Sequence, residues 1–386
     1  ETMSITVEIK SVNHRYFEFN SRVPRSYGFL EEKFISRVVN AIVGKIIFIR
    51  YLIDRKVRLL FRGTHKCLTN DDLCDILNDK VEFCNFISYL QDKDIGFDGE
   101  VFPLDKERIQ SFSDEMFQLL IGMLKSDIKA KQPFLFDMFD FSVLPIEFIS
   151  NVYEKFIGKE NQAKNGAYYT PTFLVDYIVN ETVSEFLDKR EDWNCRILDP
   201  ACGSGIFLVE SLRKMIEKYI HVSKIQRTNK QFKEELVKIV INNIFGVDKD
   251  KSAVHVAIFS IYLTLLDYQS PADIEKFKFP RIYGRNLICA NAFDCENEAI
   301  TNLEHKSKIV PFDCIIGNPP WKRGGGVGYE VTERYISKKI GDNNVVTNKE
   351  ISQAFVIRSL DFASKDTVCA LIVTSKNLYN RKARAF

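Results

Sequence analysis

The second half of this sequence predicts an α/β fold, a doubly wound and Rossmann-like parallel sheet with helices on both faces. From Gly166 onward, short apolar runs alternate with longer segments of helical spacing, the pattern of strand–helix–strand units. The apolar runs are almost continuous, as expected of parallel strands that are buried on both faces. These runs are "CRILDP", "NNIFGVD", "NLICANAF", "FDCIIGNPP" and "TVCALIVTS".

Helical segments are expected between these strands. The spacing of apolar residues places them at 171–188, 205–220, 230–242, 251–268 and 350–364. The stretch from Lys322 to Lys349 is rich in glycine and charge. It is expected to be a long functional or disordered loop that is too polar to pack.

The first part of the chain has a different pattern. Residues 3–18 alternate apolar and polar as a half-buried strand does, and residues 29–42 have helical spacing. From Val43 to Ile157 the pattern predicts helices. We therefore expect three domains: a small α+β fragment at 1–45, a helical connector domain at 46–157, and the α/β domain, with an incomplete sheet, at 158–386.

Composition excludes several classes of protein. The 386 residues are 45% hydrophobic and 27% charged with a net charge of +2, which is typical of a globular protein and not of a polycation. No apolar run reaches the roughly 18 residues of a membrane span, and no signal peptide is visible. The nine cysteines form no C-x-x-C pair and no zinc-like grouping with histidine. We expect reduced thiols, a cytoplasmic location and no metal site.

The stretch "ILDPACGSGIF" places Asp199, Ala201, Gly203 and Gly205 at a strand-to-helix turn. Glycines allow the backbone to bend tightly and to approach a ligand closely, and the helix that follows offers its amino-terminal amides. A tight turn without a ligand would explain the same residues.

Polar residues also end the next two strands. Asp248 could accept hydrogen bonds from both hydroxyls of a ribose, although a carboxylate that caps a helix would look the same. Asn291 could offer its amide to the edge of a heterocycle and Phe293 its ring to the face. The chain has neither a P-loop lysine nor an arginine placed for a 2′-phosphate. A nucleoside without phosphates therefore fits better than a nucleotide.

The fourth strand ends in "NPPW". Pro319 and Pro320 lack backbone donors, so they fix a rigid turn whose carbonyls can accept. The Asn318 side-chain oxygen and the Pro319 carbonyl can together accept from one planar amino group. An amine held in this way becomes a better nucleophile as its nitrogen turns tetrahedral. Trp321 supplies a face on which the ring bearing that amine can stack.

A further stretch, "GAYYTPTFLVDYIV", precedes the glycine turn. Thr170 and Pro171 are expected to be the N-cap and first residue of a helix, which alone would explain the pattern. The expected buried face of this helix consists of Phe173, Leu174, Tyr177 and Ile178.

Together and in this order, these segments resemble adenine-specific DNA methyltransferases of the gamma arrangement, in particular the fused type IIG restriction-modification enzymes. "GAYYTPTFLVDYIV" is similar to that family's motif X, "LDPACGSGIF" to motif I and "FGVDKD" to motif II. "CANAF" is similar to motif III, "NPPW" to motif IV, "SQAFVIRSLDFA" to motif V and "CALIVTSK" to motif VI. The resemblance covers about residues 46–386.

The resemblance implies S-adenosyl-L-methionine as cofactor and methyl transfer to the exocyclic N6 amine of an adenine flipped out of double-stranded DNA. By motif, the methionine part would lie on Tyr169, Thr170 and the turn from Asp199 to Gly205, the ribose on Asp248, and the cofactor adenine on Asn291 and Phe293. The target base would lie on Asn318, Pro319, Pro320 and Trp321. A nuclease region and a target-recognition region, which the family also uses, are expected outside this chain.

Residues 1–45 resemble a different family. The stretch "VEIKSVNHRYFEFNSRVPRSYGFLEEKF" is similar to the amino-terminal part of YicC/YloC-like endoribonucleases. Three alternatives to DNA methylation therefore stay open: methyl transfer to RNA or to a protein glutamine, an endoribonuclease remnant, and a chain that binds cofactor without turnover.

Overall fold

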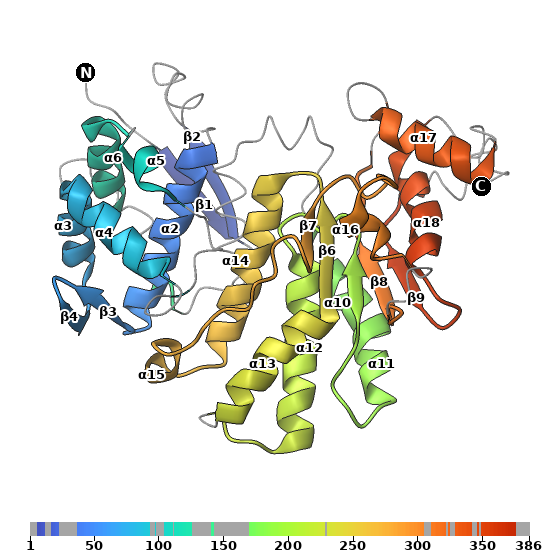
Figure 1. Ribbon diagram of the computed structural model, residues 1–386, viewed down its shortest axis with the longest axis horizontal. Helices are drawn as coiled ribbons and strands as arrows, with labels where there is room; N and C mark the ends of the chain where they lie inside the picture. The colour runs from blue at the N-terminus through green and yellow to red at the C-terminus, as the bar shows by residue number, and fades with distance from the viewer. Residues whose placement is uncertain are drawn as a thin grey trace. The chain divides into compact units, whose positions relative to one another are not determined.

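The computed structural model describes two compact units, Glu1–Pro145 and Ile146–Phe386 (Figure 1). Within them, the described residues are 6–11, 17–22, 37–92, 97, 104–110, 112–125, 140–142, 170–227, 230–304, 310–321, 323–324, 329–341, 346 and 349–375.

The first unit combines two hairpins with helices. Strands β1 (Thr6–Ser11) and β2 (Phe17–Arg22) pair antiparallel, and so do β3 (Arg58–Phe61) and β4 (Thr64–Cys67). The helices are α2 (Arg37–Asp54), α3 (Asn70–Asn78), α4 (Lys80–Leu90), α5 (Lys106–Gln110) and α6 (Asp114–Leu124). Helix α2 runs without a break through residue 45, where one predicted domain ends and the next begins.

The expectation of helices alone from Val43 onward is wrong at the β3–β4 hairpin. Arg62 and Gly63 have φ angles of 48° and 78°, as the two central residues of a tight type I′ hairpin turn require. Leu59 and Phe61 are buried, Leu60 between them is half-buried, and Arg58 is exposed. The period-two pattern is only four residues long, so the helical spacing on either side obscured it.

The second unit is built on one parallel five-stranded sheet. Its strands are β5 (Ile197–Asp199), β6 (Ile244–Asp248), β7 (Leu287–Cys289), β8 (Cys314–Gly317) and β9 (Val368–Leu371). They lie in the order β7-β6-β5-β8-β9, and every neighbouring pair is parallel. This arrangement confirms the predicted doubly wound α/β fold.

Helices surround this sheet at the five predicted places and at three further segments, 271–274, 298–301 and 329–340. They are α10 (Thr172–Val179), the π-helical turn η3 (Asn180–Ser184), α11 (Glu185–Asp188), α12 (Ile206–Ser223), α13 (Lys230–Asn243), α14 (Lys251–Asp267), α15 (Pro271–Ile274), α16 (Glu298–Thr301), α17 (Tyr329–Ile340) and α18 (Ile351–Phe362). In Figure 1, α12 and α13 lie beside β5 and β6, whereas α17 and α18 gather near β8 and β9.

Alternate residues of the strands face different helices. Leu198, Val247 and Ile315 belong to the buried cluster that α17 and α18 complete. On the opposite face of β6, a methyl group at Gly246 would lie 2.8 Å from Leu208 Cδ1 and 3.0 Å from Cys202 Sγ. Glycine therefore lets α12 and the turn before it press directly onto the sheet.

Two expectations about helices are corrected. The stretch 322–349 contains α17, which buries Thr332, Tyr335 and Ile336 despite its polar composition. In α10 the buried residues are Val175 and Val179, and the predicted buried face is wrong. There, Phe173 and Tyr177 are 57% and 63% exposed.

Within the described residues, no helix is both long enough and apolar enough to cross a membrane.

Candidate functional site

The site lies where the chain reverses direction across the sheet. The polypeptide passes from β5 outward to β6 and β7, then returns to place β8 on the other side of β5. A crevice at the carboxyl ends of the strands is expected at such a switch point. Because all five strands are parallel, Asp199, Asp248 and Asn318 end neighbouring strands at this same edge.

The glycine turn is held by the ends of β5 and β6. The Ala201 amide donates to Asp199 Oδ1 (3.0 Å), and the Gly203 amide donates to Asp248 Oδ2 (3.0 Å). The Cys202 amide donates to the Val247 carbonyl (2.9 Å). Gly203 has a φ of 51°, and among the described residues no atom beyond its chain neighbours lies within 4 Å of the position that a side chain would take there. The backbone at Gly203 therefore borders open space that a ligand can approach.

Gly205 is constrained more strongly. Its φ is 83°, and a methyl group there would lie 2.9 Å from the Ala257 side chain of α14. Gly205 is the N-cap of α12 and makes no side-chain cap bond, so the turn depends on glycine for both its conformation and its packing.

Two carboxylates give the turn its electrostatic character. Asp199 is 1% exposed, and this burial, with Asp248 nearby, raises its pKa to about 8. Burial likewise raises the pKa of the half-buried Asp248, whose Oδ1 also accepts from the Asp250 amide (2.8 Å). Such a pair favours a ligand that brings hydroxyl donors or positive charge, and it disfavours a phosphate.

Gly317 leaves the space that the Asp199 carboxylate occupies. The sequence did not point to this residue as part of the site. A methyl group at Gly317 would overlap Asp199 Oδ1 and would lie 3.0 Å from Asp199 Cγ. The last residue of β8 must therefore be small so that the β5 carboxylate can lie beside it. The feature of the sequence that could have identified it is a glycine at the end of an otherwise apolar strand.

Asn318 is oriented by a residue far away in the sequence. Its Nδ2 donates to Thr170 Oγ1 (3.0 Å), whereas its Oδ1 is buried and has no hydrogen-bond partner among the described residues. A buried acceptor without a partner costs free energy, so it marks a place where a donor is expected. Helix α10 begins at Thr172 with Pro171 as N-cap, so Thr170 does not cap it as predicted.

Trp321 is fixed at the same edge of the sheet. Its Nε1 donates to the Ile372 carbonyl (3.0 Å), and the Ile372 amide in turn donates to the Gly317 carbonyl (2.9 Å). The indole is only partly buried, and so is Pro320, whereas Pro319 is buried. The four residues of "NPPW" are therefore held between the end of β8 and the segment after β9.

Asn291 and Phe293 follow β7 in a tight loop. The Phe293 amide donates to Asn291 Oδ1 (3.0 Å), so the amide nitrogen of Asn291 is the group left for a ligand. Phe293 is 3% exposed and packs its ring against Phe355 (centroids 4.7 Å apart) and Tyr335 (5.5 Å). Its ring therefore offers little surface to a cofactor. Tyr169 lies outside the described residues.

Comparisons with known families agree with the motifs. Residues 242–386 match the model of the Eco57I restriction-modification methylase family, and residues 1–48 match that of the endoribonuclease YicC-like amino-terminal region. Both resemblances predicted from the sequence are confirmed.

Curated relatives are longer proteins. The type II restriction enzyme and methyltransferase RM.Eco57I of Escherichia coli is 25% identical over 327 residues, which are 76% of this chain and 31% of that protein. The type II methyltransferase M.BstVI of Geobacillus stearothermophilus is 24% identical over 58% of this chain and 36% of its own length. The chain thus spans about a third of these two relatives.

Solved structures share the fold. The type IIL restriction-modification enzyme MmeI, solved with DNA, has a TM-score of 0.61 and is 16% identical over 91% of this chain and 50% of its own. The type ISP enzyme LlaGI, solved as a nuclease-deletion mutant with a DNA substrate mimic, has a TM-score of 0.53 and is 14% identical over 93% of this chain and 30% of its own.

Proposed function

We propose, from the similarity of residues 242–386 to the restriction-modification methylases, that the second unit is the catalytic part of a site-specific, adenine-specific DNA methyltransferase. The proposed reaction transfers a methyl group from S-adenosyl-L-methionine to the N6 amine of adenine, within a restriction-modification system. The observation that carries this proposal is the Asn318 carboxamide, which is anchored at its nitrogen and has an unpartnered, buried oxygen.

The geometry at Asn318 suits the binding of an amino group whose two hydrogens are both donated to fixed acceptors. Because Thr170 holds Nδ2, the side chain presents Oδ1 as an acceptor. The carbonyl of Pro319 belongs to a turn that two prolines make rigid. One amino group can donate its two hydrogens to these two oxygens. The contacts strengthen as positive charge develops on the nitrogen, so they stabilise the transition state more than the ground state.

The residues at the carboxyl ends of β5 and β6 fit the proposed cofactor. When bound, S-adenosyl-L-methionine would supply a methyl group activated by its sulfonium charge. Asp248 would accept from the ribose hydroxyls, and Asp199 and the turn at Gly203 would face the charged methionine part. Asn291 would donate from Nδ2 to a nitrogen of the adenine. The positive charge of the cofactor would favour the ionised form of both carboxyl groups and so oppose the rise in pKa that burial causes.

Duplex DNA must open for this chemistry. The adenine N6 amine is paired and stacked inside a duplex, so the base has to be flipped out to reach Asn318. The partly exposed indole of Trp321 would stack on the extruded ring, an interaction worth about 1–3 kcal/mol per base. MmeI was solved in complex with DNA and LlaGI in complex with a DNA substrate mimic, which supports DNA as the proposed substrate.

Two substitutions separate chemistry from cofactor binding. Asn318→Ala is expected to lower methyl transfer by about 10²- to 10³-fold, because it removes a preorganised acceptor, while S-adenosyl-L-methionine affinity stays nearly unchanged. Asp248→Ala is expected to weaken cofactor binding first. Calorimetry measures the affinity, and transfer of a tritiated methyl group to adenine-containing DNA measures the rate.

The same assay distinguishes the alternatives. Parallel reactions with RNA and with a release-factor protein test the other substrates of Asn-Pro-Pro-aromatic enzymes. Label that enters RNA or protein in preference to DNA would reject the DNA assignment. Cofactor binding without transfer to any of the three would instead show a chain that binds S-adenosyl-L-methionine without turnover. Wild-type transfer by Asn318→Ala would show that "NPPW" is only a turn.

A further inference from the structure

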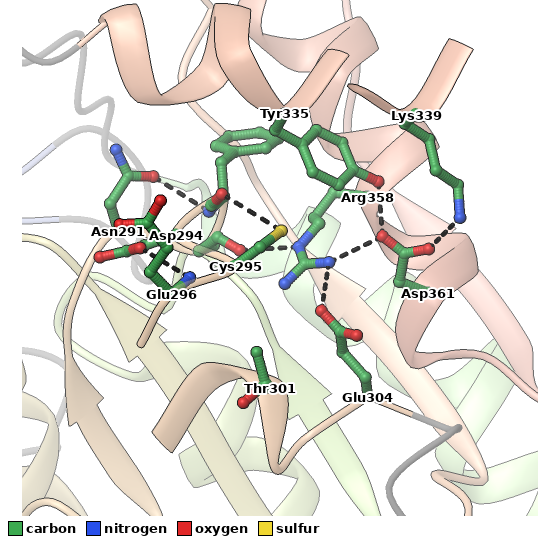
Figure 2. A network of polar contacts seen from close by, with 12 residues as sticks. Asn291, Asp294, Cys295, Glu296, Thr301, Glu304, Tyr335, Lys339, Arg358 and Asp361 are labelled. Atoms are coloured by element: carbon green, nitrogen blue, oxygen red, sulfur yellow. Dashed lines mark hydrogen bonds and ion pairs between the residues drawn. The ribbon is translucent and has the colours of Figure 1, made fainter. Parts of the chain in front are cut away.

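A buried arginine lies behind the loop that follows β7. Arg358, in α18, is 0% exposed, and its Nε donates to the carbonyl of Ala292 (2.7 Å). Ala292 lies between Asn291 and Phe293, the two residues that the sequence assigned to the cofactor adenine. Figure 2 shows this guanidinium reaching from its helix to the loop, with the amide nitrogen of Asn291 directed away from the contact.

Two carboxylates hold the guanidinium in place, that of Glu304 in the loop after α16 and that of Asp361 in α18 itself. Arg358 Nη1 lies 2.7 Å from Glu304 Oε1 and 2.7 Å from Asp361 Oδ2. Asp361 Oδ2 also accepts from the Tyr335 hydroxyl (2.6 Å), and Lys339 pairs with Oδ1 (Figure 2). Burial raises the pKa of Asp361, but hydrogen bonds from Lys339, Tyr335 and Arg358 outweigh it and leave the pKa below its ordinary value. The network therefore stays ionised at neutral pH.

Stability alone does not account for this arginine. Buried ion pairs are often no more stable than apolar residues of the same volume, because desolvation offsets the attraction. Arg358 Nη2 is moreover buried without a hydrogen-bond partner among the described residues, which adds a cost. A specific consequence of the arginine is the fixed position of the Ala292 carbonyl.

Fixing Ala292 fixes its neighbour. The loop is short: the Ala290 amide donates to the Asp248 carbonyl (3.0 Å), and the Asp294 amide donates to the Asn291 carbonyl (2.9 Å). With the Phe293 amide on Asn291 Oδ1, a movement of Ala292 would turn the Asn291 carboxamide. Beside the packing of the Phe293 ring on these helices, the contact from Arg358 is a polar link from this loop to α18 and, through Asp361, to α17.

We propose that Arg358 is a positioning residue for the cofactor, which holds Asn291 in the orientation that meets the adenine of S-adenosyl-L-methionine. This inference rests on the proposed function. It assigns to motif V a task that is carried out without touching the ligand, from a helix on the far side of the loop.

A double-substitution cycle tests whether Arg358 acts through Asn291. Arg358→Met and Asn291→Ala are each expected to weaken S-adenosyl-L-methionine binding by about 10-fold, the value of one hydrogen bond. Combined, they are expected to cost about the same 10-fold and not 100-fold, because the second change removes a group that the first has already misplaced. Calorimetry on the four proteins gives the coupling.

Arg196→Met is the matched control. Arg196 also donates to a backbone carbonyl, that of Asn242 (3.0 Å), and its guanidinium lies 4.6 Å from the centre of the Phe245 ring, but it precedes β5 at the opposite edge of the sheet. Any effect of Arg196→Met on S-adenosyl-L-methionine affinity is expected to add to the effect of Asn291→Ala without coupling. Arg358→Lys is the second variant in case methionine prevents folding. It keeps the charge but cannot engage the carbonyl and both carboxylates at once, so a partial loss of affinity is expected.

Hydrogen exchange without cofactor provides a test that is independent of the proposed function. Amides of residues 290–294 are expected to exchange at least 10-fold faster in Arg358→Met or Arg358→Lys, with the strands unchanged. Unchanged exchange in this loop, or additive costs in the cycle, would overturn the positioning role. If the unmodified chain failed to bind S-adenosyl-L-methionine, the cofactor site and the role assigned to Arg358 there would both fall, and exchange would still show whether Arg358 fixes the loop.

Discussion

Thr170 connects the segment before helix α10 with Asn318, the residue proposed to bind the target amine. Its Oγ1 accepts from Asn318 Nδ2 at 3.0 Å, across 148 residues of sequence. Thr170→Val removes this acceptor at nearly constant volume, so the Asn318 carboxamide loses its fixed orientation. We expect the methyl-transfer kcat to fall by about 10-fold, the effect of one hydrogen bond, as measured with tritiated cofactor on DNA.

Thr170→Ser is the matched control for that prediction, because it keeps the hydroxyl and should restore most of the turnover. A valine variant with normal kcat and weakened cofactor affinity would contradict the positioning of Asn318. It would return Thr170 to the methionine subsite that its motif implies.

Asp199 should make the stability of the second unit depend on pH. Burial, with Asp248 nearby, raises its pKa from the ordinary 3.8 to about 8. Between these values the folded protein holds a proton that the unfolded chain releases, so stability decreases as pH rises from about 4 to about 8. Asp199→Asn should match the wild type near pH 4 and exceed it at pH 8, by on the order of a few kcal/mol.

Tryptophan fluorescence during urea unfolding measures this effect. The two tryptophans of the chain, Trp193 and Trp321, both lie in the second unit. Asp248 is present in both proteins, so the difference between their unfolding free energies isolates Asp199. Equal pH profiles for the two proteins would show that Asp199 is ionised in the folded state.

The turn between β5 and α12 offers a comparison of two glycines. Gly203 and Gly205 both have positive φ angles, 51° and 83°, so alanine is strained at either position. Only at Gly205 would the new methyl group meet another residue, Ala257 of α14, at 2.9 Å. We expect Gly205→Ala to destabilise the second unit by about 1–3 kcal/mol more than Gly203→Ala.

Urea unfolding followed by tryptophan fluorescence again measures the difference. Equal costs for the two variants would mean that α14 moves away from the turn without loss. The control matters because conformational strain alone would lower the stability of both proteins.

Lys45 should give the first unit a pH response of the opposite sign. It is 2% exposed, and burial lowers its pKa from 10.5 to about 7. Between pH 7 and 10.5 the unfolded chain holds a proton that the folded unit has released, so stability rises with pH across that window. Lys45→Met should abolish the rise. The exposed Lys106→Met serves as control.

Hydrogen exchange of α2 amides, compared between Lys45→Met and wild type at each pH, measures this change without interference from the second unit. From pH 7 to pH 8 the stabilities of the two units should then change in opposite directions, because the first unit gains stability and the second loses it. If the α2 amides were protected from exchange to the same extent in the wild type and in Lys45→Met at every pH, Lys45 would not be a buried, largely neutral lysine.

The sequence predicted the sheet well because parallel strands buried on both faces leave strong apolar runs. It predicted that Asn318, Asp248 and the glycine turn lie close together, because the carboxyl ends of parallel strands meet at one end of such a sheet. It failed where tertiary contacts decide. Helix α17 is polar overall and packs through a few side chains such as Tyr335 and Ile336, so its composition suggested a loop.

The partners of the site residues were the other part that the sequence could not predict. The Phe293 ring was expected to face a ligand, but it packs in the core against Phe355. The hydrogen bond from Arg358 to the Ala292 carbonyl connects two residues that are 66 positions apart in the sequence. An arginine within an apolar helix was a signal, but its direction depends on how α18 lies against the β7 loop. Local patterns carry no information about such contacts.

The strand order β7-β6-β5-β8-β9 has a consequence for protein synthesis. Translation proceeds from the amino terminus, and domains begin to fold as they emerge. The half of the sheet that carries Asp199, Asp248 and Asn291 emerges from the ribosome before Asn318 does. A nascent chain can therefore bring together the residues proposed to hold the cofactor before Asn318 joins them, and β8 then adds to the free edge of β5. On the proposed function, competence for methyl transfer is therefore acquired last, because Asn318 and then Arg358 join the site after the strands that carry Asp199 and Asp248.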